Sequence, residues 1–299
     1  MDYVVQQLVN ALAFGAEYAL LALGLALVFS IMGLVNFAHG EIIAIAGYSV
    51  FFAVGLGLGS PLGAVAVAIV MGVVASVVFE RVAFRPVRYA PPTTGLLTAF
   101  GVSILVQNML LLFVSPKPRA VSILGPLNQT IFIGPYAVSS LQLIELAVTL
   151  VGIAALVLFL NKSLLGLAIR AASRDFSTVR LMGVKANRVI ATGFALSGFL
   201  AGLATVFILA RRGSVEPDFG SAPVIKAFVA CVLGGFGSLS GAAVGGLVLG
   251  FLDVAILVAL PQEYGGLRDA LTFLLVGIVL SVRPQGLLGR SVELGDKEA

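Results

Sequence analysis

Long apolar segments recur along the whole chain, and they constrain its fold more than any other feature. A helix needs about 20 apolar residues to cross the hydrocarbon core of a bilayer. Segments of about this length follow one another at 4–32, 40–59, 61–80, 95–115, 139–160, 189–210, 241–260 and 267–282. A ninth segment, 223–236, is shorter and contains Lys226, so we expect a half-helix or re-entrant element there.

The composition agrees with a chain that lies mostly within a membrane. Hydrophobic residues make up 60% of the 299 residues and charged residues 11%, which is too little charge to cover a soluble protein of this size. We therefore predict an all-α fold, a polytopic bundle of about 8–10 transmembrane or half-membrane helices in one transmembrane domain over 1–299. The acidic start Met1-Asp2 is unlike a signal peptide, so the first segment is expected to remain in the protein.

The basic residues predict an orientation. If the nine segments simply alternate, twelve of the 18 Lys and Arg residues fall on one side, which the positive-inside rule makes cytoplasmic. The N-terminus is then outside and the C-terminus cytoplasmic in a multi-pass membrane protein. This reading requires 223–236 to cross. The twelve residues are Arg81, Arg85, Arg88, Lys162, Arg170, Arg174, Arg180, Lys185, Arg188, Arg283, Arg290 and Lys297.

A polar, glycine-flanked break separates the first two apolar segments. It runs from Gly33 to Glu41 and contains Asn36 and His39, the only histidine of the chain. Irregular backbone and polar side chains at membrane depth are tolerated where they face protein or a water-lined path. We predict that Asn36, His39 and Glu41 border a translocation path, and the alternative is a short connecting turn. One histidine and one cysteine, Cys231, cannot form a zinc site of the usual kind, so no metal site is expected.

Two segments interrupt the membrane pattern. Residues 116–138 contain several prolines and glycines between β-branched residues, which favours an outer loop with short strands. Residues 162–188 favour two short helices at the cytoplasmic face, the second capped by Ser173 or Asp175 and ended by Gly183. These helices either rest on anionic lipid or dock a partner protein. The residues assigned to docking are Arg170, Arg174, Asp175, Leu181, Met182 and Gly183.

Four blocks of residues resemble a known family of membrane proteins. The blocks are Gly33-Leu-Val-Asn-Phe-Ala-His-Gly-Glu-Ile-Ile-Ala-Ile-Ala-Gly-Tyr48, Arg170-Ala-Ala-Ser-Arg-Asp175 with Leu181-Met-Gly-Val184, Phe194-Ala-Leu-Ser-Gly-Phe-Leu-Ala-Gly202, and Leu233-Gly-Gly-Phe-Gly-Ser-Leu-Ser-Gly-Ala-Ala-Val-Gly-Gly246. In this order they are similar to the permease subunits of branched-chain amino acid ABC importers. Permeases for urea and short-chain amides are also similar, so the solute stays open.

The resemblance implies a translocation subunit that works with several partners. These are a second homologous permease subunit, two cytosolic ATPase subunits, a periplasmic substrate-binding protein and membrane lipid; no nucleic acid is implied. The residues independently indicate that the chain has no Walker A loop, because Lys162-Ser163 follows Asn161 and no glycine-rich loop. We expect no cofactor in this chain, with ATP bound by the partners, and no enzyme activity. A stand-alone channel or secondary carrier is an alternative, and a membrane enzyme is the poorest one.

Glycine pairs and isolated charges complete the sequence-based predictions. The GxxxG pairs of 198–202, 241–245 and 246–250 indicate close helix packing. The run 234–241 is too rich in glycine to stay helical, aligns loosely with 33–40, and suggests a second broken segment on the path. Carboxylates within apolar spans are expected to be held by structural hydrogen bonds or to line a polar path rather than to relay protons, and Lys226 is expected to snorkel without a role. The remaining predicted residues are Gly234, Gly235, Gly237 and Ser238 for the path, Glu17, Glu145 and Asp253 as the intramembrane carboxylates, and Arg211 and Arg212 as a docking point for a binding protein or a solvated pair.

Overall fold

Helices account for most of the regular structure in this protein. The computed structural model describes residues 2–125, 129–133, 136–173, 179 and 182–288, and the all-α prediction is confirmed over these ranges. The helical elements are α1 (Asp2–Met32), α2 (His39–Gly55), α3 (Pro61–Phe79), a π-helical turn η1 (Glu80–Phe84), α4 (Pro92–Phe113), α5 (Ser140–Lys162), α6 (Leu164–Ala172), α8 (Ala186–Arg212), α9 (Ser221–Gly234), α10 (Leu239–Ala259), a 3-10 turn η3 (Gln262–Leu267) and α11 (Arg268–Val282).

Seven helical stretches in the described ranges are long and apolar enough to cross a membrane, and the protein is accordingly a multi-pass membrane protein. Two more apolar helices, α2 and α9, have 17 and 14 residues and are too short to span a bilayer unaided. The prediction of a half-helix around Lys226 is confirmed by α9. The seven stretches are Tyr3–Met32, Pro61–Phe84, Thr93–Phe113, Ser140–Lys162, Ala186–Arg212, Leu239–Ala259 and Glu263–Val282.

The segments that connect helices at one end of the bundle contain short paired strands. Strand β1 (Arg119–Ala120) pairs antiparallel with β4 (Ser214–Val215), which follows α8. Strand β2 (Thr130–Ile133) pairs antiparallel with β3 (Tyr136–Ser139) to form a hairpin. The prediction of a loop with short strands over 116–138 is therefore confirmed.

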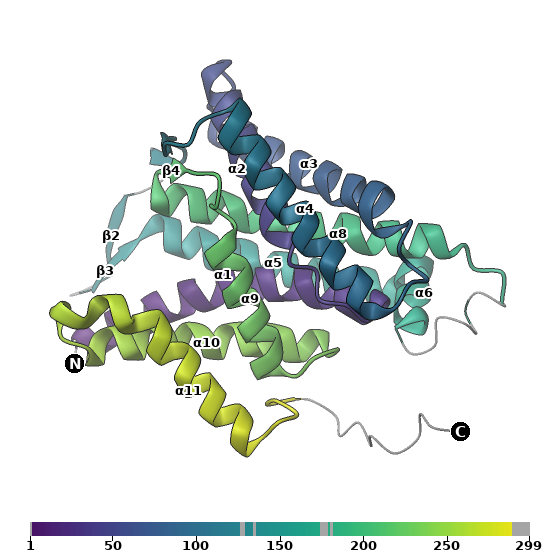
Figure 1. Cartoon of the computed structure of the whole chain (residues 1–299). Coiled ribbons are helices and arrows are strands. Elements are labelled where there is room, and N and C mark those ends of the chain that lie inside the picture. Colours follow the sequence, from purple (N-terminus) through teal and green to yellow (C-terminus); the bar gives the residue numbers. More distant parts are fainter. Residues whose placement is uncertain (1, 126–128, 134–135, 174–178, 180–181, 289–299) are drawn as a thin grey trace.

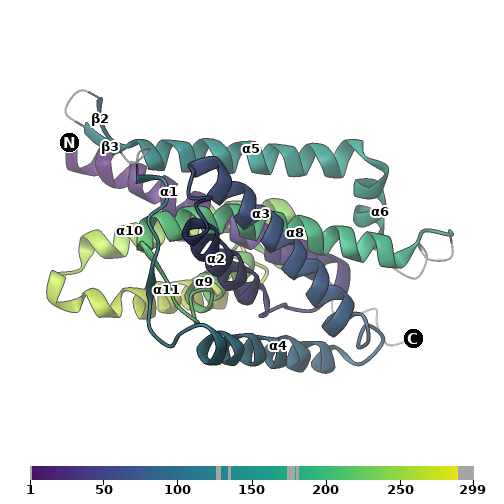
Figure 2. The same cartoon turned by 90° about the horizontal axis from the view of Figure 1, so that it is seen from above.

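The centre of the bundle is formed by α1 and α8, most of whose residues are buried (Figures 1 and 2). Helix α1 packs most extensively on α10, and α8 packs most extensively on α3. Both contacts are close because glycines face the neighbouring backbone: a Cβ atom on Gly15 would lie 2.9 Å from Cα of Leu247, and one on Gly72 would lie 2.6 Å from the carbonyl oxygen of Gly198. The packing role predicted for the GxxxG pairs is confirmed.

The bundle has two ends, which we call the N-terminal face, where α1 begins and α8 ends, and the α6 face opposite it. Figure 2 shows the N-terminal face on the left and α6 on the right. Helix α10 begins at the α6 face, since Gly246 and Gly250 near its middle lie on Ala19 and Gly15 of the antiparallel α1. Residues 213–234 therefore carry the chain from one face to the other. The orientation predicted from the basic residues required the chain to pass from one face to the other in this region, and it does so.

Two groups of four helices follow the same order along the chain. Both α1–α4 and α8–α11 consist of a long helix, a short one and two longer ones. The groups run in opposite directions, because α1 begins at the N-terminal face and α8 ends there. Their contacts correspond as well: α1 on α10 matches α8 on α3, and α2 on α3 matches α9 on α10. The fold is thus an inverted repeat, in which α5 and α6 connect the two units.

Candidate translocation path

The chain leaves its helical path between α1 and α2. Gly33 ends α1 with φ at 68°, a left-handed conformation that glycine adopts readily. The following residues turn back into the bundle, and the ring of His39 lies against Gly24. Gly24 precedes the end of α1 at Met32 by about two turns, so α2 begins roughly 12 Å back along α1. Helix α2 is a half-helix whose N-terminus is inside the protein.

A second break of the same form lies between α8 and α9. Gly213 ends α8, also with φ at 68°, and α9 begins after Gly220. The two breaks share the pattern Gly-x-Val-x-x-x-x-Gly, which runs from Gly33 to Gly40 and from Gly213 to Gly220. The second break therefore lies between the first and second helices of α8–α11, just as the first break lies between the first and second helices of α1–α4.

The two half-helices meet at their N-termini. A Cβ atom on Gly40 would lie 2.8 Å from the carbonyl oxygen of Gly220, and a Cβ on Gly220 would overlap the backbone of Gly40. Only glycine at both positions permits this approach. We call this meeting point the Gly40–Gly220 junction. The partial positive charge of two helix N-termini gathers there, an arrangement that suits an anionic group.

The loose alignment of 234–241 with 33–40 was wrong. Residues 235–238 form the tight turn between α9 and α10, where Gly235 and Gly237 have positive φ and Ser238 Oγ accepts from the N–H of Gly241 at 3.0 Å. The backbones of Gly234 and Gly241 touch at the base of this turn. Because a tight turn between two packed helices requires these glycines, they need no other role; a contact with the path remains a prediction.

One polar side chain of the first break, that of Glu41, lies beside the junction. Glu41, in the first turn of α2, accepts at Oε1 from Ser103 Oγ (2.7 Å) and from Gln107 Nε2 (2.8 Å), both on α4. The same Gln107 nitrogen is 3.3 Å from Ser221 Oγ at the start of α9. A carboxylate in this place is stabilised by the helix N-termini by about 0.3–1 kcal/mol. Glu41 therefore links α2, α4 and α9.

Several atoms of the polar side chains in the first break have no hydrogen-bond partner among the described residues. They are both amide atoms of Asn36, Nε2 of His39 and Oε2 of Glu41. All three residues are at most 2% exposed, whereas a buried unpartnered polar atom costs about 1–3 kcal/mol. Because a simple turn gains nothing for this cost, the arrangement suits contact with a polar solute. That role remains a prediction.

A buried ion-pair cluster holds Glu145 of α5 and Glu17 of α1 near the N-terminal face. Arg211 Nη2, at the end of α8, donates to both oxygens of Glu145 at 2.9 and 2.7 Å, and it is 3.2 Å from Glu17 Oε2. Arg211 also lies over the ring of Phe14, 4.3 Å from its centroid. Arg211, predicted to dock a binding protein, is thus already paired with carboxylates within the protein. This pairing could not be seen in the sequence, because Glu145 and Arg211 are 66 residues apart. Docking of a binding protein remains a prediction, with Arg212 the more exposed candidate.

A second cluster surrounds Asp253 of α10. Its oxygens accept from Tyr18 Oη at 2.7 Å, from Arg268 Nε and Nη2 at 3.0 and 2.7 Å, and from Thr272 Oγ1 at 3.2 Å. Lys226 Nζ is 3.1 Å from the same carboxylate. The expectation that Lys226 snorkels without a role was wrong, because its ammonium is drawn inward to a buried anion. The structural hydrogen bonding predicted for the intramembrane carboxylates is confirmed for Glu145 and Asp253. Glu17 has an ion pair with Arg211, but its Oε2 atom has no hydrogen bond among the described residues.

A comparison with known proteins identifies the family to which this chain belongs. The family model described as the branched-chain amino acid transport system / permease component matches residues 7–281. The chain belongs to this family. The match begins within α1 and ends within α11, so it includes both half-helices and both ion-pair clusters of the permease.

Relatives of the permease align over nearly their whole length. The high-affinity branched-chain amino acid transport system permease protein BraD of Pseudomonas aeruginosa is 37% identical over 299 residues, covering 96% of each chain. The corresponding protein LivH of Escherichia coli K12 is 34% identical over 301 residues, again covering 96% of each chain. LivH of Salmonella typhimurium has the same identity and coverage.

The segment between α5 and α8 of the permease is described in part. Helix α6 begins where Ser163 Oγ accepts from the N–H of Gly166 at 2.9 Å, which confirms the first of the two predicted short helices. Arg170 donates to Asn161 at 2.6 Å, Met182 is 78% exposed, and Gly183 has φ at 80°. The other residues assigned to docking lie outside the described ranges; they are Arg174, Asp175 and Leu181.

Proposed function

We propose that this permease is the membrane-spanning translocation subunit of an ABC importer for branched-chain amino acids in a bacterial inner membrane. The observation that carries the proposal is the Gly40–Gly220 junction, where two oppositely directed half-helices present their N-termini inside the bundle. Transporters built from inverted repeats bind solutes at such broken helices, with helix N-termini directed at anionic groups of the solute. The α-carboxylate of an amino acid is such a group.

The relatives support the choice of solute. The names of those that align over their full length specify branched-chain amino acids, and an aliphatic amino acid combines the carboxylate that the junction suits with an apolar side chain. We propose that leucine, isoleucine and valine pass between the α2 and α9 half-helices, bordered by Asn36, His39 and Glu41. Selection among them is expected mainly in the separate periplasmic binding protein.

The energy for transport comes from other subunits in this proposal. Two cytosolic ATPase subunits bind the ATP, a second homologous permease completes the membrane part, and residues 170–183 contact the ATPases. The distribution of basic residues supports a cytoplasmic α6 face, because the ends of α3 and α5 and the starts of α6 and α8 all lie there. The N-terminal face is then outside, with the N-terminus, and the C-terminal end of the chain is cytoplasmic.

Uptake by cells tests the function directly. Cells that lack the permease should lose high-affinity uptake of radiolabelled leucine, isoleucine and valine, and the intact permease should restore it. Uptake should stop when cytosolic ATP is depleted while the membrane potential is maintained. Restoration of urea uptake in place of leucine uptake would favour the amide permeases. Leucine uptake that survives ATP depletion would favour a secondary carrier.

A further inference from the structure

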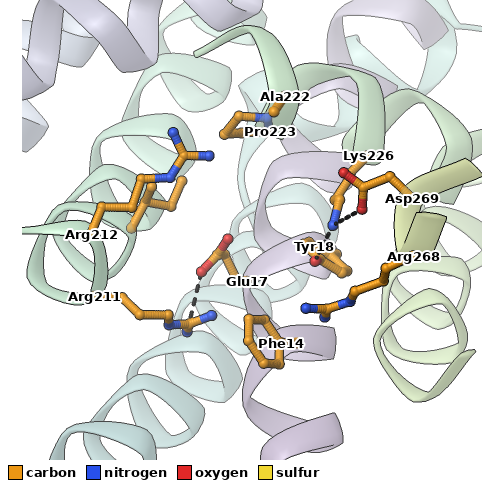
Figure 3. A pocket seen from close by; sticks show the side chains of 11 residues that line it. Phe14, Glu17, Tyr18, Arg211, Arg212, Ala222, Pro223, Lys226, Arg268 and Asp269 are labelled. Carbon is orange, nitrogen blue, oxygen red and sulfur yellow. Dashed lines mark hydrogen bonds and ion pairs between the residues drawn. The ribbon is translucent and has the colours of Figure 1, made fainter. Parts of the chain in front are cut away.

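A small cavity of about 170 Å³ opens between α1, α8, α9 and α11 near the N-terminal face. Figure 3 shows that its lining carries charges of both signs from separate helices. This volume is below the roughly 300–1,000 Å³ of pockets for larger ligands, so it suits a solute of few atoms. The lining residues are Phe14, Glu17, Tyr18, Ile208, Arg211, Arg212, Ala222, Pro223, Lys226, Arg268 and Asp269.

Most charges around this cavity are paired within the protein. Arg211 is held by Glu145, as described above, while Lys226 and Arg268 share Asp253. Lys226 Nζ is also 3.0 Å from Asp269 Oδ1. These side chains contribute charge to the cavity lining, but most of their hydrogen-bonding groups already pair with other residues of the protein.

Two groups of opposite sign retain capacity for a ligand. Arg212 has no hydrogen bond in the part of the chain described; its nearest carboxylate, on Glu216, is 4.0 Å away. Glu17 is 8% exposed, and its Oε2 atom is buried without a hydrogen bond, although Arg211 is 3.2 Å away. In Figure 3 Arg212 and Glu17 project toward the same space from α8 and α1.

We propose that this cavity binds the zwitterionic head group of an amino acid, with Glu17 accepting from the α-ammonium and Arg212 donating to the α-carboxylate. The proposal rests on the proposed function and names a binding site for its solute. A planar guanidinium matches a carboxylate with two parallel hydrogen bonds. The apolar side chains of Phe14, Ile208 and Pro223 offer a surface to an aliphatic group.

The charges of the cavity disfavour other classes of solute. A phosphate or other multiple anion meets Glu17 and Asp269, and a metal cation meets four basic side chains. A neutral sugar offers neither Glu17 nor Arg212 an opposite charge, so it gains no charge-assisted hydrogen bond in this largely buried site. A solute with one charge of each sign satisfies both groups.

The position of the cavity connects it to the Gly40–Gly220 junction. Ala222 and Pro223 line the cavity and lie two and three residues after Gly220, in the first turn of α9. A ligand in the cavity therefore contacts the same end of α9 that packs on α2. In the proposed orientation the cavity faces outside, so the solute meets it before the junction.

The absence of tryptophan from the chain allows a direct binding assay. In the variant Phe14→Trp, the new indole is the sole one and borders the cavity. The full chain is purified in lipid nanodiscs and titrated with L-leucine, with 3-methylbutylamine, which lacks the carboxylate, and with 4-methylpentanoate, which lacks the ammonium. We expect saturable fluorescence changes, with both analogues binding about 10- to 100-fold more weakly than leucine, as expected for loss of a hydrogen bond to a charged group.

Second substitutions assign each charge. Glu17→Gln should weaken leucine binding to about the level of 4-methylpentanoate and leave 4-methylpentanoate binding unchanged. Arg212→Gln should weaken leucine binding to about the level of 3-methylbutylamine and leave that amine unchanged. Arg119→Gln, an exposed arginine in β1 near the same face, is the matched control and should change neither. Ala222→Leu, which fills the cavity without removing a charge, should abolish the leucine response at an unchanged melting temperature.

The outcomes separate this site from the proposed function. If the unmodified permease in nanodiscs binds radiolabelled leucine no more tightly than Glu17→Gln and Arg212→Gln do, while it restores leucine uptake in cells, the cavity proposal is wrong and the function stands. If Arg212→Gln leaves leucine binding intact but removes stimulation by the binding protein, Arg212 belongs to a protein-docking surface and the cavity proposal is also wrong. If the unmodified chain restores no leucine uptake, the proposed function fails.

Discussion

An alanine at the Gly40–Gly220 junction is expected to separate the two half-helices. The Cβ of Gly40→Ala would lie 2.8 Å from the Gly220 carbonyl oxygen and 3.2 Å from Cγ1 of Val224, whereas ordinary contact begins at 3.4 Å. The valine can change rotamer, but the carbonyl belongs to the backbone of the turn before α9. Helices α2 and α9 must therefore move apart by about 0.6 Å, a shift of the size that overpacked interiors undergo.

This displacement has a predictable cost. Overpacking of a tightly packed interior costs about 1–3 kcal/mol, and the gain in helix propensity from glycine to alanine is at most about 1 kcal/mol. We expect Gly40→Ala to be less stable than the unmodified permease by about 1–2 kcal/mol, and Gly220→Ala to be worse because its Cβ overlaps the Gly40 backbone. Leucine uptake should fall with both.

Thermal unfolding in detergent, followed by circular dichroism, measures the first effect, and uptake in cells at equal membrane abundance measures the second. Gly101→Ala is the matched control, since Gly101 lies within α4 and a Cβ there meets no atom within 4 Å. Gly101→Ala should melt at or above the temperature of the unmodified permease, because alanine in a helix stabilises the folded state by up to about 1 kcal/mol relative to glycine. If Gly40→Ala and Gly101→Ala melt and transport alike, the junction is not tightly packed and the argument fails.

Three further substitutions test other parts of the permease. Arg211→Gln leaves Glu145 buried without its counter-charge, at a cost of about 3–5 kcal/mol, so it should melt well below Arg211→Lys; equal melting temperatures would show that the cluster is solvated. Glu41→Leu should leave assembly with the ATPase intact, as measured by co-purification, while uptake falls several-fold; normal uptake would reduce the first break to a connecting turn. Asp175→Lys should insert normally yet uncouple ATP hydrolysis from uptake, and unmodified uptake in vesicles would refute docking by 170–183.

The positions of the helices could be predicted from the sequence because the bilayer sets their length. Each of the nine predicted segments corresponds to a helix, and the shortness of 223–236 anticipated α9. The prediction of a full span over 40–59 was wrong, because α2 is a half-helix of 17 residues that begins inside the protein. The partners of the charged residues could not be predicted in this way. Arg211 and Glu145 are 66 residues apart, and uniformly apolar helices carry little information about which faces meet. The hydrophobicity of a segment predicts that it spans the membrane, but it does not predict which other helices it packs against.

The second half of the candidate path was missed for a different reason. Glycine content drew attention to 234–241, where the glycines form a turn, whereas the true counterpart of the first break has only two of them, Gly213 and Gly220. The shared spacing Gly-x-Val-x-x-x-x-Gly was present in both breaks. A search for the spacing, together with a preceding long helix and a following short one, would have found it.

The pairing of α1 with elements near the end of the chain has a consequence for biosynthesis. Tyr18 and its partner Asp253 are 235 residues apart, and at about 5–20 residues per second the ribosome needs roughly 10–50 s to add them. During that time α1 has left the ribosome while its Glu17 carboxylate still lacks Arg211, and its glycine-bearing face still lacks α10. An isolated carboxylate is costly in lipid, so until the second repeat arrives the Glu17 carboxyl of the nascent first helix is expected to be protonated or to stay in contact with water or the insertion machinery.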